Sequence, residues 1–200
     1  MKMFQELQHN LAAIAEKARS GMVRIESRGH GAGAGTVWHS KGLILTNAHV
    51  AANKNLLVSD NNGGRYPARV LASDRSLDLA ALSISAIELP AIELGSSAAM
   101  RPGEIILAMG FPWGIDGGLT AGVMIGLEAW WPVKRLPRRE WLMASVHLRP
   151  GHSGGPMVDA RGRLIGINTI MRGPDVGAAI PVETAARFLQ ASLAKREIAA

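Results

Sequence analysis

Cysteine is absent from this 200-residue sequence. Its absence excludes disulfide frameworks, thiol catalysis and cysteine-based zinc sites, and it leaves the redox compartment open. Charged residues are also scarce, at 19%, whereas hydrophobic residues reach 48%. This balance is typical of a packed globular chain and excludes a disordered one. A chain of this length holds one large domain or two small ones.

Long apolar runs are missing as well. No run approaches the roughly 20 residues that a membrane-spanning helix needs, and no uninterrupted apolar stretch with a small-residue cleavage site marks an export signal. If Met1 is the natural start, this favours a cytoplasmic location, whereas a trimmed chain would fit the periplasm or another extracytoplasmic compartment. We expect neither a metal nor another cofactor.

The formal net charge of +6 gives the chain a basic surface. Such a surface attracts nucleic acid, anionic lipid or acidic protein through its long-range field. The basic residues are scattered, however, except in the run 134–139, which follows Trp130 and Trp131. We interpret the segment Trp130–Arg139 as a protein-contact or regulatory loop and do not expect it to bind nucleic acid.

Short apolar runs and 23 glycines predict an all-β fold with frequent turns. Turn signals such as Gly31-Ala32-Gly33 separate about six strands on each side of a crossing segment at 94–103. Two closed, six-stranded antiparallel β-barrels would leave no exposed strand edges. The predicted strands are 22–27, 35–38, 43–46, 56–59, 66–72, 79–83, 104–110, 119–127, 141–146, 156–158, 164–169 and 177–180.

A helix is predicted at each end of the chain. Apolar residues recur at three- and four-residue spacing in 1–19, and a second helix begins at Pro181 and runs to Lys195. The first helix either packs on its own barrel or forms a homo-oligomer interface, and the pattern leaves both readings open. The predicted units are an N-terminal helix (1–20), a first barrel (21–95), a second barrel (96–182) and a C-terminal helix (183–200).

The stretch Gly151–Pro156 places a serine among glycines. Glycine allows backbone angles that other residues resist, and it lets the chain pass close to a bound group. Such a loop can expose the Ser153 hydroxyl and turn backbone N–H groups toward one point. A serine nucleophile needs both, because its attack on a carbonyl leaves an oxyanion. A plain turn is the alternative; the loop alone favours the nucleophile, which also requires a base and an orienting carboxylate.

His49 and Asp78 stand in contexts that suit these two roles. His49 directly follows the apolar strand 43–46, so its position is fixed while its ring can face a cleft; a histidine satisfied in the core is an equal alternative. Asp78 opens an apolar run, where a carboxylate is costly unless it is hydrogen-bonded. An imidazole N–H would satisfy this carboxylate and would be oriented in return. A capping aspartate is the weaker reading.

Three motifs therefore occur in the order His, Asp, Ser: Thr46-Asn47-Ala48-His49-Val50, Asp78-Leu79-Ala80 and Gly151–Pro156. Together they make the chain resemble a trypsin-like serine protease of the chymotrypsin fold, in the bacterial HtrA/Deg branch. Further matches to that branch lie in 33–37, 110–114, 119–122, 165–169 and 179–181, so the resemblance covers about residues 22 to 190.

The resemblance implies a role for each motif residue. Ser153 would be the nucleophile, His49 the general base and acid, and Asp78 the carboxylate that orients the ring. The oxyanion hole would lie in the loop Gly151, His152, Ser153, formed by the backbone N–H groups of Gly151 and Ser153. Polypeptides, unfolded or damaged ones above all, would be the substrates, cleaved through an acyl-enzyme intermediate.

The specificity pocket should be lined by Leu148, Ile167, Asn168 and Thr169 if the family layout holds. No acidic residue matches the base of that pocket, so we expect small or medium apolar side chains before the cleaved bond. The family usually continues into PDZ domains, whereas this sequence ends at Ala200, after the closing helix. Capture of a substrate C-terminus by a PDZ domain is therefore not expected within these residues.

His152 departs from the family, which usually has Asn or Asp before the nucleophile. Because a histidine cannot supply the negative charge that receives a freed N-terminus, activation by N-terminal insertion is not expected. His152 either makes an ordinary structural contact or tunes the oxyanion loop by its protonation.

Two other functions compete with an active endopeptidase. A catalytically silent, protease-like scaffold would bind peptide or protein partners, although the presence of His49, Asp78 and Ser153 argues against it. A nucleic-acid-binding β-barrel is supported by the net charge alone.

Overall fold

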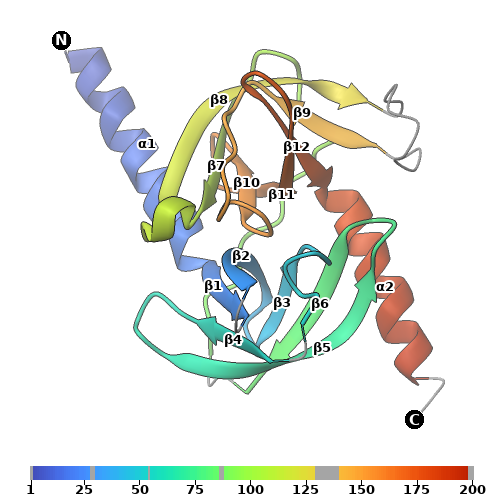
Figure 1. Cartoon of the computed structure of the whole chain (residues 1–200). Coiled ribbons are helices and arrows are strands. Elements are labelled where there is room, and N and C mark those ends of the chain that lie inside the picture. Colours follow the sequence, from blue (N-terminus) through green and yellow to red (C-terminus); the bar gives the residue numbers. More distant parts are fainter. Residues whose placement is uncertain (1, 28–29, 54, 86–87, 129–139, 198–200) are drawn as a thin grey trace.

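The computed structural model describes the chain except for residues 1, 28–29, 54, 86–87, 129–139 and 198–200 (Figure 1). The predicted Trp130–Arg139 loop therefore lies outside the described residues. Two closed β-barrels form the body of the molecule, with one helix at each end of the chain. This confirms the predicted all-β fold with two six-stranded antiparallel barrels and terminal helices.

Both barrels have the same strand order. In the first, β1 pairs with β2 and β4, and the order β1-β2-β3-β6-β5-β4 closes the sheet; the second repeats it as β7-β8-β9-β12-β11-β10. The first set is β1 (Met22–Ser27), β2 (His30–His39), β3 (Leu43–Thr46), β4 (Leu56–Ser59), β5 (Arg65–Asp74) and β6 (Leu79–Ile84). The second set is β7 (Ile105–Gly110), β8 (Gly118–Glu128), β9 (Trp141–Ala144), β10 (Pro156–Asp159), β11 (Leu164–Gly173) and β12 (Val176–Pro181), with a 3₁₀ turn, η1 (Pro112–Gly114), between β7 and β8.

The prediction of a turn at Gly31-Ala32-Gly33 was wrong, because these residues lie inside β2. Gly33 pairs with Ile25 of β1. A side chain at Gly33 would place its Cβ 2.7 Å from Val50 Cγ1. The glycine therefore permits close packing against the chain segment that carries His49, which sequence patterns do not separate from turn formation.

The second helix begins one residue later than predicted. Pro181 is the last residue of β12 and pairs with Gly166 of β11, and α2 runs from Val182 to Glu197. Proline is tolerated at this strand end because it lacks only a backbone N–H, and the pairing of β12 with β11 ends at this residue.

Among its described side chains, the first helix, α1 (Lys2–Ser20), packs on the barrels through those of its second half. Ala18 is fully buried, and Leu11, Ile14 and Ala15 are partly buried against the same core. Phe4 is 67% exposed, and Figure 1 shows the N-terminal half projecting away from the body. Within the described residues, neither helix is long and apolar enough to cross a membrane.

One hydrophobic cluster joins the two barrels and both helices. It contains side chains from the first barrel (Leu45, Leu79), the second barrel (Met109, Trp141, Ile167), α1 (Ala18) and α2 (Phe188). Because burying a large apolar side chain contributes about 1.5–3 kcal/mol, this cluster holds the barrels in one fixed arrangement. Segments from both barrels thereby meet where Asp78, the residue before β6, contacts Thr169 of β11.

Removal of residues 1–10 tests the role of the projecting half of α1. Because the described side chains of this half are exposed, we expect the free energy of unfolding to change by no more than about 0.5 kcal/mol. Denaturant unfolding measures this change, and a larger loss would contradict the packing described. Gel filtration of the same variant tests oligomerisation, since an unchanged assembly size excludes this part of α1 as an interface.

Candidate active site

His49 and Asp78 are in direct contact. His49 follows β3, and Asp78 immediately precedes β6, which pairs with β3. The ring Nδ1 of His49 lies 3.0 Å from Asp78 Oδ1 and 2.9 Å from Oδ2, and the His49 backbone N–H donates to Oδ1 at 3.1 Å. The His49 side chain is 50% exposed and that of Asp78 only 19%, so the carboxylate is sheltered while the ring reaches solvent.

Asp78 adopts a backbone conformation that few non-glycine residues have. Its φ angle is +53°, in the left-handed region, which costs on the order of 1–3 kcal/mol. Asn47 offsets part of that cost, because its Nδ2 donates to the carbonyl of Asp78 at 3.0 Å. The turn before β6 is thus held in the shape that points the carboxylate at His49.

Thr169 is a site residue whose part the sequence did not reveal. It was predicted to line the specificity pocket, yet its hydroxyl donates to Asp78 Oδ2 at 2.7 Å from β11 of the other barrel. Burial pushes the pKa of Asp78 up, but hydrogen bonds from the His49 ring and the Thr169 hydroxyl outweigh it and lower the pKa below 3.8. An ionised carboxylate only accepts hydrogen bonds. Nδ1 of His49 therefore carries the proton, and Nε2 is left as an acceptor.

Ser153 lies in a loop that is bonded to the first barrel. The Ala34 N–H donates to the Ser153 carbonyl at 2.8 Å, and the Thr36 hydroxyl donates to the Gly154 carbonyl at 3.1 Å. A Cβ at Gly154 would collide with the Ala34 carbonyl, so only glycine fits there. The Ser153 hydroxyl itself donates to the Thr169 carbonyl at 3.1 Å.

The loop before Ser153 leaves two backbone donors available. Gly151 has φ +103°, and its carbonyl accepts from the Phe111 N–H at 2.9 Å. The His152 N–H is used inside the loop, donating to the Arg149 carbonyl at 3.0 Å. No hydrogen bond to another described residue occupies the N–H groups of Gly151 and Ser153. These two groups, and not that of His152, can bind an anion.

A cavity of about 360 Å³ brings the predicted residues of the two barrels together. Its walls include His49 and Val50 from the first barrel and Pro150, Gly151 and Ser153 from the second. An imidazole, a hydroxyl and backbone donors therefore share one solvent-accessible space, which is the arrangement that acyl transfer to serine requires.

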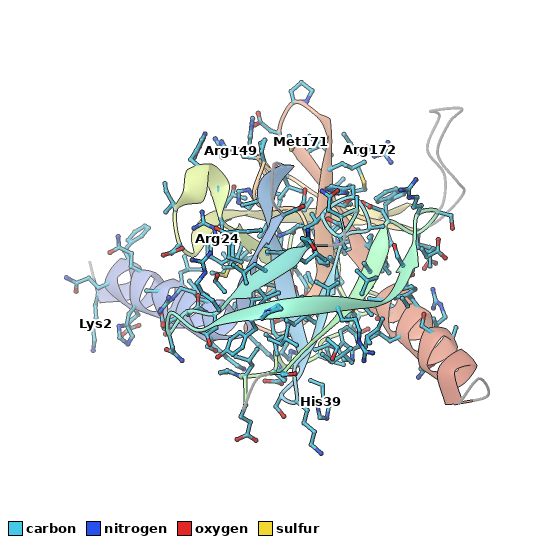
Figure 2. All side chains as sticks on the ribbon, turned by 60° about the horizontal axis from the view of Figure 1, so that its bottom comes forward. Lys2, Arg24, His39, Arg149, Met171 and Arg172 are labelled. Carbon is cyan, nitrogen blue, oxygen red and sulfur yellow. The ribbon has the colours of Figure 1, made fainter. Side chains whose placement is uncertain are left out.

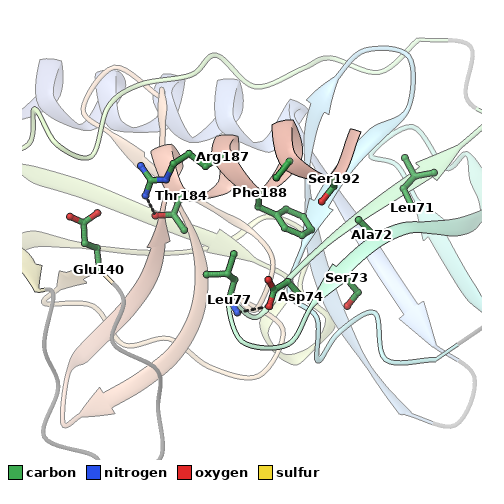
Figure 3. A pocket seen from close by; sticks show the side chains of 11 residues that line it. Leu71, Ala72, Ser73, Asp74, Leu77, Glu140, Thr184, Arg187, Phe188 and Ser192 are labelled. Atoms are coloured by element: carbon green, nitrogen blue, oxygen red, sulfur yellow. Dashed lines mark hydrogen bonds between the residues drawn. The ribbon is translucent and has the colours of Figure 1, made fainter. Parts of the chain in front are cut away.

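A larger cavity, of about 790 Å³, lies elsewhere, between α2 and the turn from β5 to β6 (Figure 3). Apolar side chains such as Leu71, Leu77 and Phe188 line it, and the Arg187 guanidinium donates to the Thr184 hydroxyl at its edge. None of the predicted site residues lines this cavity. We place the candidate site in the smaller cavity because the reactive groups converge there.

The other residues predicted for the specificity pocket are buried. Leu148 and Ile167 contribute to hydrophobic clusters, and Asn168 is fully buried, with its Nδ2 donating to the Met109 carbonyl at 2.9 Å. They do not line the cavity shared by His49 and Ser153. Among the described residues, no group of three or more His, Asp or Glu side chains is placed to hold a metal ion.

Comparison with known proteins assigns the chain to a family. Residues 33–167 match the model of the trypsin-like peptidase domain, and the chain belongs to this family. Proteins that are similar to the chain include serine proteases named HTRA1 and HTRA2 and the solved structure of an HtrA-type protease.

Two curated relatives illustrate the similarity. The chain is 34% identical to the putative serine protease HhoB of Synechocystis sp. over 168 residues, covering 80% of this chain and 40% of HhoB. It is 33% identical to serine protease HTRA1A of Danio rerio over 198 residues, covering 91% of this chain and 41% of the relative. The chain thus spans about two fifths of the length of these relatives.

Solved structures agree with this assignment. The HtrA-type protease AlgW with a tripeptide superposes with a TM-score of 0.83 at 30% identity, covering 90% of this chain and 62% of AlgW. AlgW with a decapeptide gives a TM-score of 0.83 at 26% identity, covering 91% of this chain and 67% of AlgW.

Replacing Thr169 with valine tests how the Asp78 carboxylate is held. Because Thr169→Val removes one hydrogen bond to a charged group, we expect a loss of about 1.5–3 kcal/mol in unfolding free energy near neutral pH. The lowered pKa of Asp78 sets the sign: its stabilisation is present above pH 3.8 and is lost as the pH falls through the folded-state pKa. The difference in unfolding free energy between the wild type and Thr169→Val should therefore disappear in acid, as measured by denaturant unfolding at several pH values.

Thr36→Val is the matched control. It removes a buried threonine hydroxyl that donates to the Gly154 carbonyl and, among the described residues, bonds to no carboxylate. The loss of unfolding free energy in Thr36→Val should not depend on whether Asp78 is ionised. A Thr169→Val deficit with the same pH dependence as that of Thr36→Val would contradict the described role.

Proposed function

We propose that this chain is an active serine endopeptidase in which Ser153 is the nucleophile, His49 the general base and acid, and Asp78 the orienting carboxylate. One observation carries the proposal: the ring of His49 bonds to Asp78 through Nδ1, and the same ring shares a cavity with Ser153. The family membership and the free N–H groups of Gly151 and Ser153 support it further.

The reaction follows from these positions. His49 Nε2 takes the proton of the Ser153 hydroxyl as its oxygen attacks the substrate carbonyl, and the resulting oxyanion binds the N–H groups of Gly151 and Ser153. His49 then gives that proton to the leaving amine, and the C–N bond breaks to leave an acyl-enzyme. A water molecule, deprotonated by His49, hydrolyses the ester and restores Ser153. Asp78 stabilises the imidazolium in both steps and is not itself protonated.

One contact favours a second candidate, a catalytically silent scaffold that binds peptides. The Ser153 hydroxyl donates to the Thr169 carbonyl and not to His49. Rotation about the Cα–Cβ bond of Ser153 would have to redirect the hydroxyl toward His49 before it could react. A protein locked in the observed rotamer would bind polypeptide without cleaving it.

Unfolded or damaged polypeptides are the proposed substrates, because a site between two barrels admits an extended segment and not a folded domain. We propose small or medium apolar side chains before the cleaved bond. Leu148 and Ile167, from the stretches proposed to form the pocket, are buried and apolar, and neither they nor Asn168 and Thr169 bring an acidic group that would bind lysine or arginine.

Ser153→Ala distinguishes catalysis from silent binding. Loss of the nucleophile should lower casein and peptide hydrolysis by ~10⁴-fold or more and abolish labelling by an organophosphonate, since no oxygen remains to form the covalent bond. Ser145→Ala, an exposed serine in the same barrel, should keep wild-type labelling and hydrolysis. A wild-type chain that binds casein but neither cleaves it nor takes the label would support the scaffold instead.

Peptides that differ only in the residue before the cleaved bond test the proposed specificity. We expect kcat/KM for alanine, valine or leucine to exceed that for arginine roughly tenfold or more, because a cationic side chain would lose hydration without gaining a partner. Mass spectrometry of the products identifies the cleaved bond. Equal or faster cleavage after arginine would refute the pocket assignment.

A further inference from the structure

His152 is a buried histidine whose ring contacts the backbone that leads into the nucleophile loop. Its side chain is only 1% exposed. The ring Nδ1 lies 3.1 Å from the Arg149 backbone nitrogen and 3.2 Å from the Arg149 carbonyl oxygen. The His152 backbone N–H donates to that same carbonyl at 3.0 Å. Arg149 and His152 thus close one tight turn with two hydrogen bonds of opposite direction.

The contacts select one protonation state of the ring. The Arg149 N–H points at Nδ1, so a proton on Nδ1 would face that N–H, although the Arg149 carbonyl at 3.2 Å has a second lone pair that could accept it. The Arg149 N–H therefore favours an unprotonated Nδ1, which puts the proton of the neutral ring on Nε2, because a neutral imidazole has one donor and one acceptor nitrogen. Nε2 is buried and has no hydrogen-bond partner among the described residues.

The turn also encloses the peptide group of Gly151. Gly151 lies between Arg149 and His152, with its carbonyl held by the Phe111 N–H at 2.9 Å and its φ at +103°. A Cβ at Gly110 would collide with the Gly151 carbonyl oxygen and His152 Cα at 2.5 Å, so the loop has little room on that side. If the bond between Arg149 and His152 opened, the Gly151 peptide would lose one of its two supports.

We propose that His152 is a positioning residue for the oxyanion-binding loop: its neutral ring accepts the Arg149 N–H and so presents the Gly151 N–H to the reacting carbonyl, and protonation of the ring releases the turn. The proposal rests on the proposed serine endopeptidase activity and deepens it with a regulatory residue.

The surroundings of His152 make its protonated form costly. An imidazolium would turn Nδ1 into a donor that faces the Arg149 N–H and has only the Arg149 carbonyl, at 3.2 Å, as acceptor, and Nε2–H would remain buried without an acceptor among the described residues. The charged groups that act on the ring are Arg149, whose guanidinium lies over the Trp113 ring at 4.8 Å, and His147, which bonds Asp175 at 2.9 Å.

The Gly110–Phe111 backbone and the Asn168 carbonyl pack against the loop as uncharged groups. His49 lines the same cavity as Gly151 and Ser153, and the Arg24 guanidinium lies over the Phe111 ring at 5.5 Å. Burial accordingly lowers the pKa of His152 below 6.5. The ring is neutral above that pH, and the turn between Arg149 and His152 is released only at lower pH, where the ring is protonated.

Two variants of His152 distinguish a role in holding the turn from a role in packing alone. His152→Asn keeps an oxygen that can accept the Arg149 N–H but cannot be protonated, whereas His152→Leu fills the site without an acceptor. At mildly alkaline pH we expect His152→Leu to lower kcat roughly 10- to 100-fold with little change in KM, because an oxyanion donor is misplaced, while His152→Asn recovers most of the loss.

His39→Asn is the matched control. The ring of His39 also accepts a backbone N–H, from Lys41 at 3.2 Å, but the side chain is exposed and lies on the opposite side of the molecule from Arg149 in Figure 2. This variant should leave kcat and its pH dependence as in the wild type. Thermal unfolding of all variants checks that they are folded.

The pH profile of kcat/KM supplies the decisive readout. In the wild type, protonation of His152 removes activity in addition to any other loss in acid, so the acid limb should be steeper than that of His152→Asn by a slope of roughly one. Equal kcat for His152→Leu and His152→Asn, or the same acid slope in wild type and His152→Asn, would overturn the proposal.

NMR of histidine-labelled protein decides the question without catalysis. We expect the ring of His152 to hold its proton on Nε2 near neutral pH and the Gly151 amide signal to follow its titration in acid, with no such step in His152→Asn. A proton on Nδ1, or a Gly151 signal indifferent to His152, would refute the positioning role even in an active enzyme. If the spectra are as expected but the chain takes no organophosphonate label, the role of His152 in the turn stands and the proposed protease activity is refuted.

Discussion

The contact on which this site depends is the backbone hydrogen bond from Ala34 of the first barrel to the carbonyl of Ser153 in the second. Ser153 and His49 lie in loops of separate barrels, so neither barrel alone can set the distance between them. The Thr36 bond to Gly154 and the lack of room for a side chain at Gly154 fix the same approach. Because Ala34 bonds to Ser153 through backbone groups, β2 cannot shift by one residue along this loop without breaking the contact.

A second link between the barrels acts on the electrostatics of the site. Thr169 of β11 donates to the Asp78 carboxylate of the first barrel and, through its carbonyl, accepts the Ser153 hydroxyl. One residue thus touches both the carboxylate that orients the imidazole and the serine that must react. The shared hydrophobic cluster below them supplies the rigidity, and the hydrogen bonds supply the direction.

Local patterns in the sequence were sufficient to predict the two barrels, because alternating apolar residues and turn signals mark most strands. They misplaced Gly31-Ala32-Gly33, since a glycine needed for close packing and a glycine needed for a turn look alike in one sequence. The motifs around His49, Asp78 and Ser153 indicated the site, and the structure brings His49 and Asp78 into contact. The bond from Thr169 and the turn closed by His152 could not be predicted, because each depends on register and tertiary contact.

If Ser153 reacts as proposed, it is acylated during turnover with the help of His49. A pre-steady-state measurement with an activated ester of an apolar amino acid, followed by acid quenching and peptide mapping, follows this step. We expect a burst of leaving group that approaches one per chain and an acyl group located on Ser153. A linear time course from the first turnover, with no acyl group on Ser153 at any quench time, would contradict it.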